Sequence, residues 1–431
     1  AEVLPRALLA HLSLPPILLG SSDLGRFLVI LPDQARADSA AEFLSRAAEK
    51  LREITGGLIR LIWSSTENLG DWTVVRKRLA DGLRGQERRR ILAAGFFDAF
   101  ETPAAPPDVL PRGLRDAVRV GWSFEFPALI SAEGGEYRWD LGNQASTGNI
   151  ALTRHAARNG GAVASAKELA KRAEGRKLWG ILRGQIDDFA TRMRRLHTVE
   201  EHVHFSMLYK QFIAGEIELL CSQGDFFQRV TVLYCGSGEF ALCGSWDALA
   251  GFARELERVF ARFAEESLKE LPGAEAKTIT MAIALASPSD SLARVWEDCR
   301  RDLGTAQAAD KDCLYLLGRV LEWKQLNDAA ELKDAIVRVN EEFRGGRVFL
   351  SQLRNLYKKL EAPERADEDR LMARAARFPR RFARVATRRE REFQKLRSHL
   401  MKEMSGRGER GKLKLRPEGL IALEWARLVE D

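Results

Sequence analysis

Short apolar runs alternate with amphipathic stretches from the start of the chain. The run Phe27 to Leu31 is typical of a buried strand, and Pro32 ends it. Ser39 to Glu42 has the form of a helix capping box, and the apolar positions that follow keep one helical face as far as Gly56-Gly57. The run Leu58 to Trp63 then predicts another strand. The first hundred residues therefore predict a strand-helix-strand unit, followed by a second helical stretch.

The middle of the chain has a less regular pattern. The proline-rich segment 102–111 indicates a boundary or an exposed loop. Glycines 134 and 135 favour a hairpin, and the sequence KELAKRAEG, which ends at Gly175, favours a helix. We interpret this stretch as a variable linking segment.

From Lys177 onward the periodicities of strands and helices alternate. Strands are predicted over 178–182, 229–235, 239–243 and 278–286, and helices over 202–220 and 249–263. This order, βαββαβ, is that of a ferredoxin-like palm. A further helix near 292–303 and a strand over 313–317 follow, and the chain is helical from Trp323 onward.

Composition excludes several classes of protein. No stretch approaches the roughly 18 uncharged apolar residues that a membrane span requires, and the apolar N-terminus is interrupted by Arg6 and His11, so we expect a soluble protein without a targeting signal. The five cysteines form no C-x-x-C pair, which favours neither a zinc ribbon nor a disulfide framework. A reducing cytoplasm fits this usage of cysteine best.

Positive charge is concentrated near the C-terminus. The chain has a net charge of +7, yet 17 Lys or Arg and only 4 Asp or Glu lie between Arg370 and Arg416. The densest part interleaves Phe378 and Phe382 with six arginines, which are Arg377, Arg380, Arg381, Arg384, Arg388 and Arg389. Arginines pair well with phosphates, so we interpret this basic tail as a nucleic-acid-binding segment. A protein-binding segment and a solvated helix face are the alternatives.

The second predicted palm has candidate chemistry at two places. Palm-type polymerases and nucleotide cyclases hold two metal ions with carboxylates from the end of the first strand and from the apex of the central hairpin. Here the first strand runs LRGQIDDF, from Leu182 to Phe189, and the hairpin runs YCGSGEFAL, from Tyr234 to Leu242.

These two segments resemble the palm-bearing large subunit of type III CRISPR effector complexes, especially the Csm-type. Its patterns are close to LKxDVDNLG and YSGGDDxFLVGPWD, and Gly244 to Asp247 resemble the GPWD of that family. The segment Gly318 to Leu326 resembles the entry to its C-terminal helical domain. The resemblance implies an α+β fold with two ferredoxin-like palms. We therefore expect a degenerate N-terminal palm over 1–112, a linking segment over 113–175, a second palm over 176–320 and a helical domain over 321–431.

The candidate site departs from the family pattern at the positions that would bind metal ions and phosphate. The aspartate at the strand end is replaced by Gln185, and the GGDD turn has become Gly236-Ser237-Gly238-Glu239. Only Glu239 keeps a carboxylate at the turn, with Asp187 and Asp188 near it on the first strand. A later Ser-x-Gly is replaced by Met281 to Ala284, and a phosphate-binding lysine by Gln307. We interpret these positions as a retired active site that has no catalytic residue and holds neither a metal nor a cofactor.

The resemblance also implies a role and a set of partners. The chain has no His-Asp dipeptide and no four-cysteine cluster, so we expect neither the nuclease domain nor the zinc insert that many relatives carry. The implied function is a catalytically inactive large subunit that scaffolds guide RNA and target RNA. Its implied protein partners are the subunit that binds the repeat handle, the small helical subunit and the backbone subunits, which would cleave the target.

Two alternatives remain. In the first, the chain is an active cyclic oligoadenylate synthase in which Glu239 works with Asp187 or Asp188. In the second, it is a degenerate GGDEF-type nucleotide sensor, because Glu239-Phe240 match the last two letters of that motif.

Overall fold

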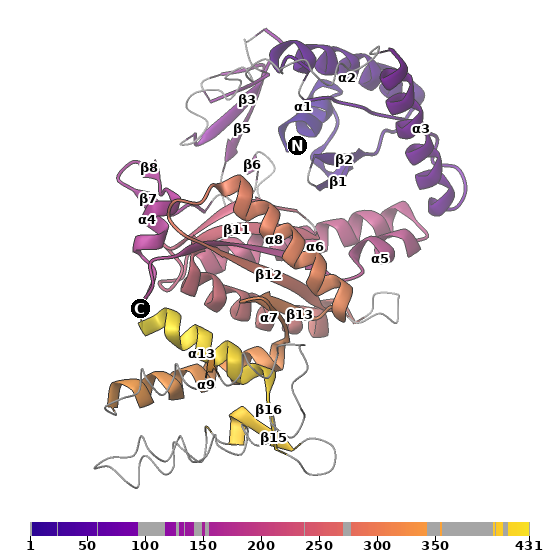
Figure 1. Ribbon diagram of the computed structural model, residues 1–431. Coiled ribbons are helices and arrows are strands. Elements are labelled where there is room, and N and C mark those ends of the chain that lie inside the picture. Colours follow the sequence, from indigo (N-terminus) through magenta and orange to yellow (C-terminus); the bar gives the residue numbers. More distant parts are fainter. Residues whose placement is uncertain are drawn as a thin grey trace.

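The structure is a computed structural model of the chain (Figure 1). It describes residues 2–23, 25–57, 59–93, 117–125, 129–132, 134–141, 149–150, 155–236, 238–269, 277–342, 354–355, 400, 402–407 and 413–430. Among these residues, no helix is both long enough and apolar enough to cross a membrane.

The N-terminal part packs helices against short strands. Its elements are α1 (Val3–His11), a 3-10 helix (Pro16–Leu18), the antiparallel hairpin of β1 (Leu19–Asp23) and β2 (Arg26–Val29), α2 (Gln34–Ile54) and α3 (Trp72–Ala93). A separate sheet has the order β4-β3-β5-β6, with β3 at Arg119–Trp122, β4 at Ile130–Ser131, β5 at Tyr137–Leu141 and β6 at Asn149–Ile150. Phe43 of α2 and Trp122 of β3 meet in one apolar core, with ring centroids 5.8 Å apart.

Two expectations for this part are wrong in detail. The helix begins at Gln34, before the expected capping box at Ser39, because the Asp33 carboxylate accepts a hydrogen bond from the Arg36 N–H at 2.7 Å. Residues 59–63 form no strand, although Leu61 and Trp63 are partly buried in the N-terminal core. The structure describes β1 and β2 as the only strands within residues 2–93, apart from the gaps at 24 and 58. The N-terminal palm therefore stays a prediction.

The second palm is a six-stranded sheet with the order β10-β11-β9-β12-β13-β14 (Figure 1). Its strands are β9 (Trp179–Ile186), β10 (Val230–Cys235), β11 (Glu239–Ser245), β12 (Ile279–Ala286), β13 (Cys313–Leu316) and β14 (Arg319–Glu322). The first four pair antiparallel, and β13 adds parallel to β12. The predicted order βαββαβ is confirmed.

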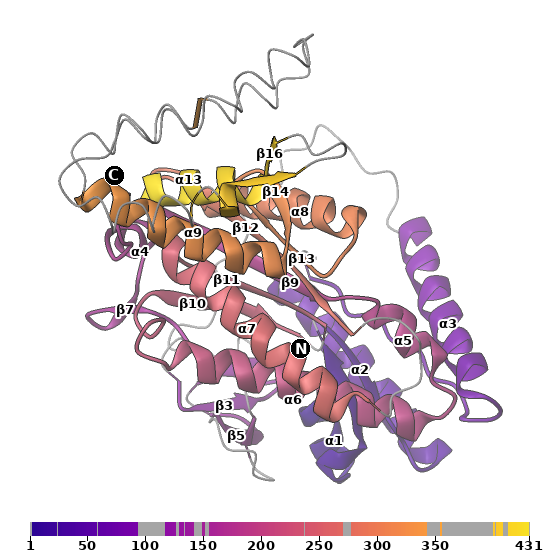
Figure 2. The ribbon, with the colours of Figure 1, turned by 90° about the horizontal axis from the view of Figure 1, so that it is seen from below.

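Helices cover both faces of this sheet (Figure 2). The palm helices α6 (Val199–Cys221) and α7 (Trp246–Ser267) pack with Leu182, Phe240 and other residues of one face. The helix α8 (Leu292–Ala309) covers the opposite face, where Cys299 lies against Ile181. The short helix α5 (Phe189–Arg195) leaves the end of β9, while α4 (Ala166–Lys171) and the hairpin of β7 (Arg158–Asn159) and β8 (Ala162–Val163) precede it.

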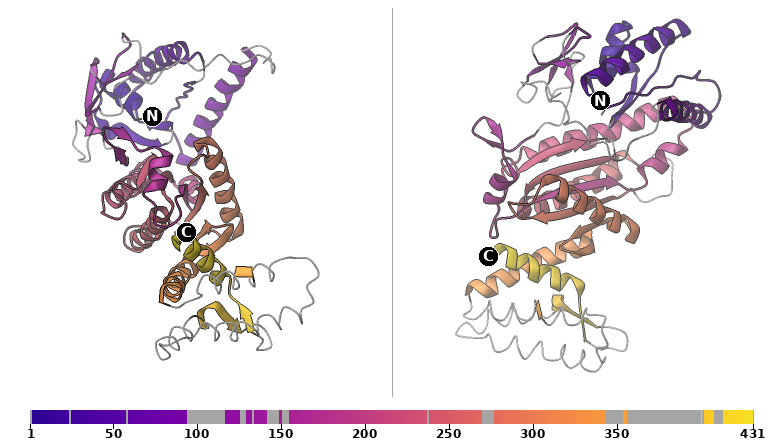
Figure 3. Two further views of the ribbon diagram at one scale, coloured as in Figure 1. Left: turned by 60° about the vertical axis from the view of Figure 1, so that its left-hand side comes forward. Right: turned by 45° about the horizontal axis from the view of Figure 1, so that its top comes forward.

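The C-terminal helices lie against the palm. Helix α9 (Trp323–Glu342) follows β14 directly, and α13 (Pro417–Glu430) lies beside it (Figure 3). A small hairpin, β15 (Ser405–Arg407) with β16 (Leu413–Leu415), precedes α13. Trp425 of α13 belongs to the same core cluster as the α6 and α7 face of the sheet.

Candidate active site at the palm hairpin

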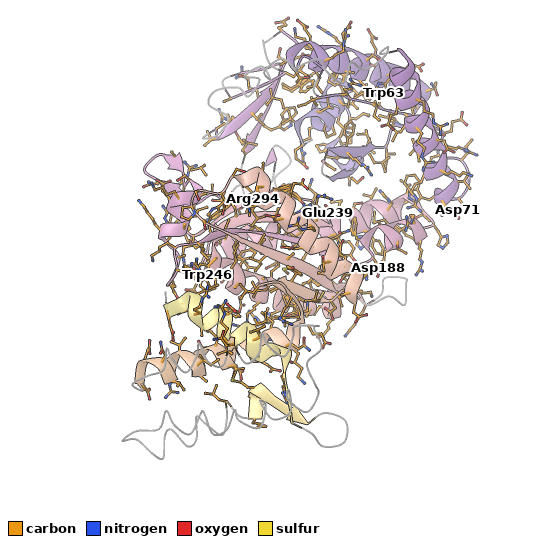
Figure 4. The ribbon with its side chains drawn as sticks, in the orientation of Figure 1. Trp63, Asp71, Asp188, Glu239, Trp246 and Arg294 are labelled. Carbon is orange, nitrogen blue, oxygen red and sulfur yellow. The ribbon has the colours of Figure 1, made fainter. Side chains whose placement is uncertain are left out.

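The end of β9 and the turn of the β10–β11 hairpin lie side by side, as the sequence predicts. Gln185 is in register with Glu239 on one side and with Thr280 of β12 on the other. Figure 4 shows Glu239 and Asp188 at this end of the sheet. Because successive side chains of a strand point to opposite faces, Arg183 and Gln185 share the face of the sheet that α8 covers.

Gln185 occupies the strand-end position that the family pattern gives to an aspartate. Its side-chain oxygen accepts a hydrogen bond from the Gln307 amide of α8. Gln307 stands where the family pattern has a lysine. Two neutral residues, Gln185 and Gln307, are therefore bonded to each other at positions where the family pattern has an acid and a base. The pair supplies no charge for a cation or for a phosphate.

Asp187 is buried, with an exposed fraction of 4%. Its carboxylate accepts hydrogen bonds from the hydroxyls of Thr278 at 2.8 Å and Thr280 at 2.7 Å, and from the Asp312 N–H at 3.1 Å. These three donors lie just before β12, in β12 and in the turn between α8 and β13. The carboxylate therefore links three parts of the palm through hydrogen bonds, and it is not exposed to solvent.

Asp188 follows in a left-handed conformation, with φ of 55°, immediately before α5. Its carboxylate forms an ion pair with the Lys311 ammonium at 2.8 Å. This hydrogen bond with Asp188 raises the pKa of Lys311. Lys311 itself has φ of 57°, so a tight turn presents it to Asp188.

The hairpin turn is closed by backbone bonds and by an aromatic ring. The Gly236 N–H donates to the Glu239 carbonyl, and the Ile186 N–H to the Gly238 carbonyl, both at 2.8 Å. A Cβ atom on Gly238 would lie 2.7 Å from Cδ1 of Phe189. The ring therefore occupies the space that a side chain at this position would need. Ser237 lies outside the described residues.

Glu239 is half-buried beside Tyr234, whose pKa is raised by burial and, to a smaller degree, by Glu239. Tyr234 also bonds Arg183, whose guanidinium stacks on Trp296 of α8 at 4.4 Å. In the described part of the chain, Glu239 forms no ion pair. Of the three candidate carboxylates, Asp187 is held by neutral hydrogen-bond donors and Asp188 by a lysine, whereas the described residues give Glu239 neither.

The donor set does not fit a two-metal centre. Two metal ions need bridging carboxylates, whereas Gln185 is neutral and Asp187 is already bonded to three donors. Within the described ranges, no group of three or more His, Cys, Asp or Glu side chains could hold a metal ion. Met281 and Ile283, in place of the family's Ser-x-Gly, lie in the palm core.

Sequence reasoning missed the residues that complete this site. Phe189, Lys311 and the two threonines come from other elements, and only the Lys311-Asp312 dipeptide before a strand hinted at a tight turn. The six tail arginines, Arg377, Arg380, Arg381, Arg384, Arg388 and Arg389, lie outside the described residues.

Comparison with known proteins agrees with the resemblance read from the sequence. Residues 178–315 match the model of the second palm domain of Cas10/Cmr2. No curated protein sequence matches the chain. The fold is similar to that of Csm1 in T. onnurineus, with a TM-score of 0.68 at 12% identity, over 99% of this chain and 64% of that one.

Two further solved structures are Csm1-Csm4 cassettes, one in complex with pppApApA and one with cA4. Their TM-scores are 0.66 and 0.62, at 14% and 15% identity. They cover 100% and 99% of this chain and 64% and 65% of the matched chains. The chain thus spans less than two thirds of the length of the Csm1 structure named first. The chain therefore has a fold similar to that of these Csm1 proteins.

Proposed function

We propose that this chain is the large subunit of a type III CRISPR RNA-guided effector and that its cyclase site is catalytically inactive. One observation carries the proposal: the groups of the candidate site are bonded to the protein itself. Gln185 bonds Gln307, Asp187 accepts three hydrogen bonds and Asp188 pairs with Lys311.

Electrostatics supports this reading. Nucleotide cyclisation requires cations that neutralise the triphosphate and align the attacking hydroxyl. A carboxylate that must first break three hydrogen bonds, or an ion pair with a lysine, is a poor ligand for those cations. Glu239 alone cannot bridge two metal ions and also balance their charge. A single lost electrostatic stabiliser typically costs 10²- to 10³-fold in rate, and here several are lost together.

The proposed role is therefore assembly. The Csm1-Csm4 cassettes show a protein of this fold with its neighbour, which suggests docking on a Csm4-like subunit that binds the repeat handle of the guide RNA. Contacts with the small helical subunit, the backbone subunits and the target RNA complete the proposal. The arginines between Arg377 and Arg389 would hold RNA phosphates. The division into two palms, a linking segment and a helical end is part of the same proposal.

The test is conversion of labelled ATP by the natively purified complex, with Mg²⁺ or Mn²⁺ and matched target RNA. We expect RNA in the preparation and no oligonucleotide product. An active Csm1-Csm4 cassette under the same conditions is the positive control.

Target-dependent cyclic product that Glu239→Gln abolishes would overturn the proposal and establish the synthase alternative. Guanine-nucleotide binding by the chain, with no RNA in the preparation, would instead favour the nucleotide sensor. The two alternatives are therefore distinguishable in one set of measurements.

A further inference from the structure

Helix α3 and helix α5 carry a second concentration of positive charge, separate from the basic tail. Helix α3 has seven Lys or Arg and two Asp or Glu in 22 residues, and α5 has three Arg and no acidic residue in seven. The whole chain has a net charge of only +7. Together they have a net charge of +8, whereas the chain outside the tail has a net charge of −6 (+7 − 13).

The inner face of α3 is fixed to the palm. Trp72 and Val75 are buried in the palm core, and the backbone N–H of Trp72 donates to the His197 carbonyl at 3.0 Å. The Arg76 guanidinium donates to the carbonyls of Met193 and Arg194 at the end of α5. A helix C-terminus presents unpaired carbonyls, so Arg76 satisfies groups that would otherwise need water. Figures 1 and 2 both show α3 at the edge of the molecule beside α5.

The outward face of α3 carries several cations and an exposed acid, Asp81. Lys77, Arg84 and Arg88 are exposed, and their spacing of seven and four residues places them on one stripe of the helix. In the described part of the chain, Lys77 and Arg88 make no ion pair, while Arg84 pairs with Asp81 at 3.2 Å. Arg78, also exposed, donates to the Leu69 carbonyl at 3.2 Å.

We propose that this α3 basic face, made by Lys77, Arg84 and Arg88, binds the phosphate backbone of single-stranded RNA. Exposed cations on a rigidly anchored helix match a chain of phosphates, and binding of this kind is independent of base sequence. A membrane-binding helix would need an apolar face in addition, and Val74 is the one large apolar side chain exposed on the described part of α3. The choice of RNA rests on the proposed function.

The test measures binding of the full chain to a labelled oligouridine RNA over a series of salt concentrations. The variant replaces Lys77, Arg84 and Arg88 with Ala. We expect weaker binding and a slope of log affinity against log salt that is shallower by about 2, because each phosphate contact on a single strand contributes ~0.7.

The matched control replaces three exposed arginines of α8 with Ala. Arg294 pairs at 3.4 Å with Asp290, just before α8, and Arg300 and Arg301 pair with acids of α8 at 2.8 and 2.6 Å, so the same charge is removed from a neutralised face. Equal affinity and slope in the α3 variant and this control would overturn the inference and leave the face to an acidic protein partner. A tail variant, with Arg380, Arg381, Arg384, Arg388 and Arg389 replaced, is measured in parallel. If the tail variant alone loses binding, the α3 inference fails while the proposed RNA scaffold stands.

Discussion

At the hairpin turn, the ring of Phe189 leaves no room for a side chain at Gly238 unless the ring moves. Gly238→Asp would restore a family carboxylate, but its Cβ would meet Cδ1 of Phe189 at 2.7 Å. We expect this overpacking to lower the free energy of unfolding by about 1–3 kcal/mol, measured by denaturant unfolding. Gly304→Asp on α8 is the control, because nothing lies within 4 Å of a Cβ there. Equal stability of the two variants would show that the ring moves aside without cost.

Asp187 and Asp188 are adjacent, yet we expect them to differ in what they contribute. Asp187→Ala leaves two buried or partly buried hydroxyls and the Asp312 N–H without their acceptor, which should cost roughly 2–4 kcal/mol of unfolding free energy. Asp188→Asn removes only a partly exposed ion pair and keeps a residue that tolerates positive φ, so a loss below about 1 kcal/mol is expected. Urea unfolding of both variants checks this. Similar losses would contradict the structural role of Asp187.

The sequence located this site but not its partners. The resemblance directed attention to Gln185, Asp187 and Asp188, and the structure brings all three to the end of β9 beside the hairpin. The residues that bond them, such as Lys311, are more than 90 positions away along the chain. Their approach depends on the register of β12 with β9 and on two consecutive positive φ angles, which no local pattern specifies.

At the scale of elements, the palm was predictable because its helices have one apolar face and its central strands, covered by helices on both faces, are short apolar runs. The prediction failed for the segment around Trp63, which is partly buried but does not form the expected strand. Around Trp63, backbone and side-chain groups bond to α3 instead of to a neighbouring strand: the Trp63 N–H donates to Gln86 at 3.4 Å, and the Ser64 hydroxyl donates to the Leu79 carbonyl at 2.8 Å. Apolar periodicity predicts which residues are buried. The hydrogen-bond partners of the backbone then decide whether the segment forms a strand.

The contact of α3 with α6 makes a prediction about pH. His202 of α6 lies against Trp72, and burial, with a smaller effect of Arg76, lowers its pKa from 6.5 to about 4. The unfolded chain therefore takes up a proton at this residue first as the pH falls from about 6.5 to about 4, so stability falls with pH in that window. We expect the melting temperature to drop between pH 6.5 and pH 5, and less steeply in His202→Gln.

His155 provides the comparison for this measurement. Burial also lowers the pKa of His155, although the nearby Glu218 opposes the shift, so His155→Gln should flatten the same pH profile to a smaller extent. Identical pH profiles for the His202→Gln variant and the unmodified chain would exclude His202 as a source of the acid sensitivity. Asp71 and His197 also lie at this junction, and the ion pair between them at 3.5 Å is largely exposed.

At the scale of the whole molecule, the C-terminal helices belong to the core of the palm. Trp425 of α13 and Trp323 of α9 share one apolar cluster with the sheet, and the Arg176 N–H, just before β9, donates to the Leu428 carbonyl at 2.7 Å. An ion pair between Arg354 and Glu424 adds a second contact to α13. The expected boundary near residue 320 therefore marks a change of secondary structure without a break in packing.

This shared core predicts that palm and C-terminal helices unfold together. Trp425→Ala removes a side chain that is 6% exposed, and a substitution of this kind costs about 3–5 kcal/mol. We expect one cooperative transition in calorimetry, shifted to lower temperature in Trp425→Ala, and failure of a chain that lacks residues 417–431 to fold. Glu331→Gln, on an exposed position of α9, is the control and should leave the transition unchanged. A truncated chain that keeps the full melting temperature would mean that the palm folds alone, and the C-terminal helices would then be a separate domain.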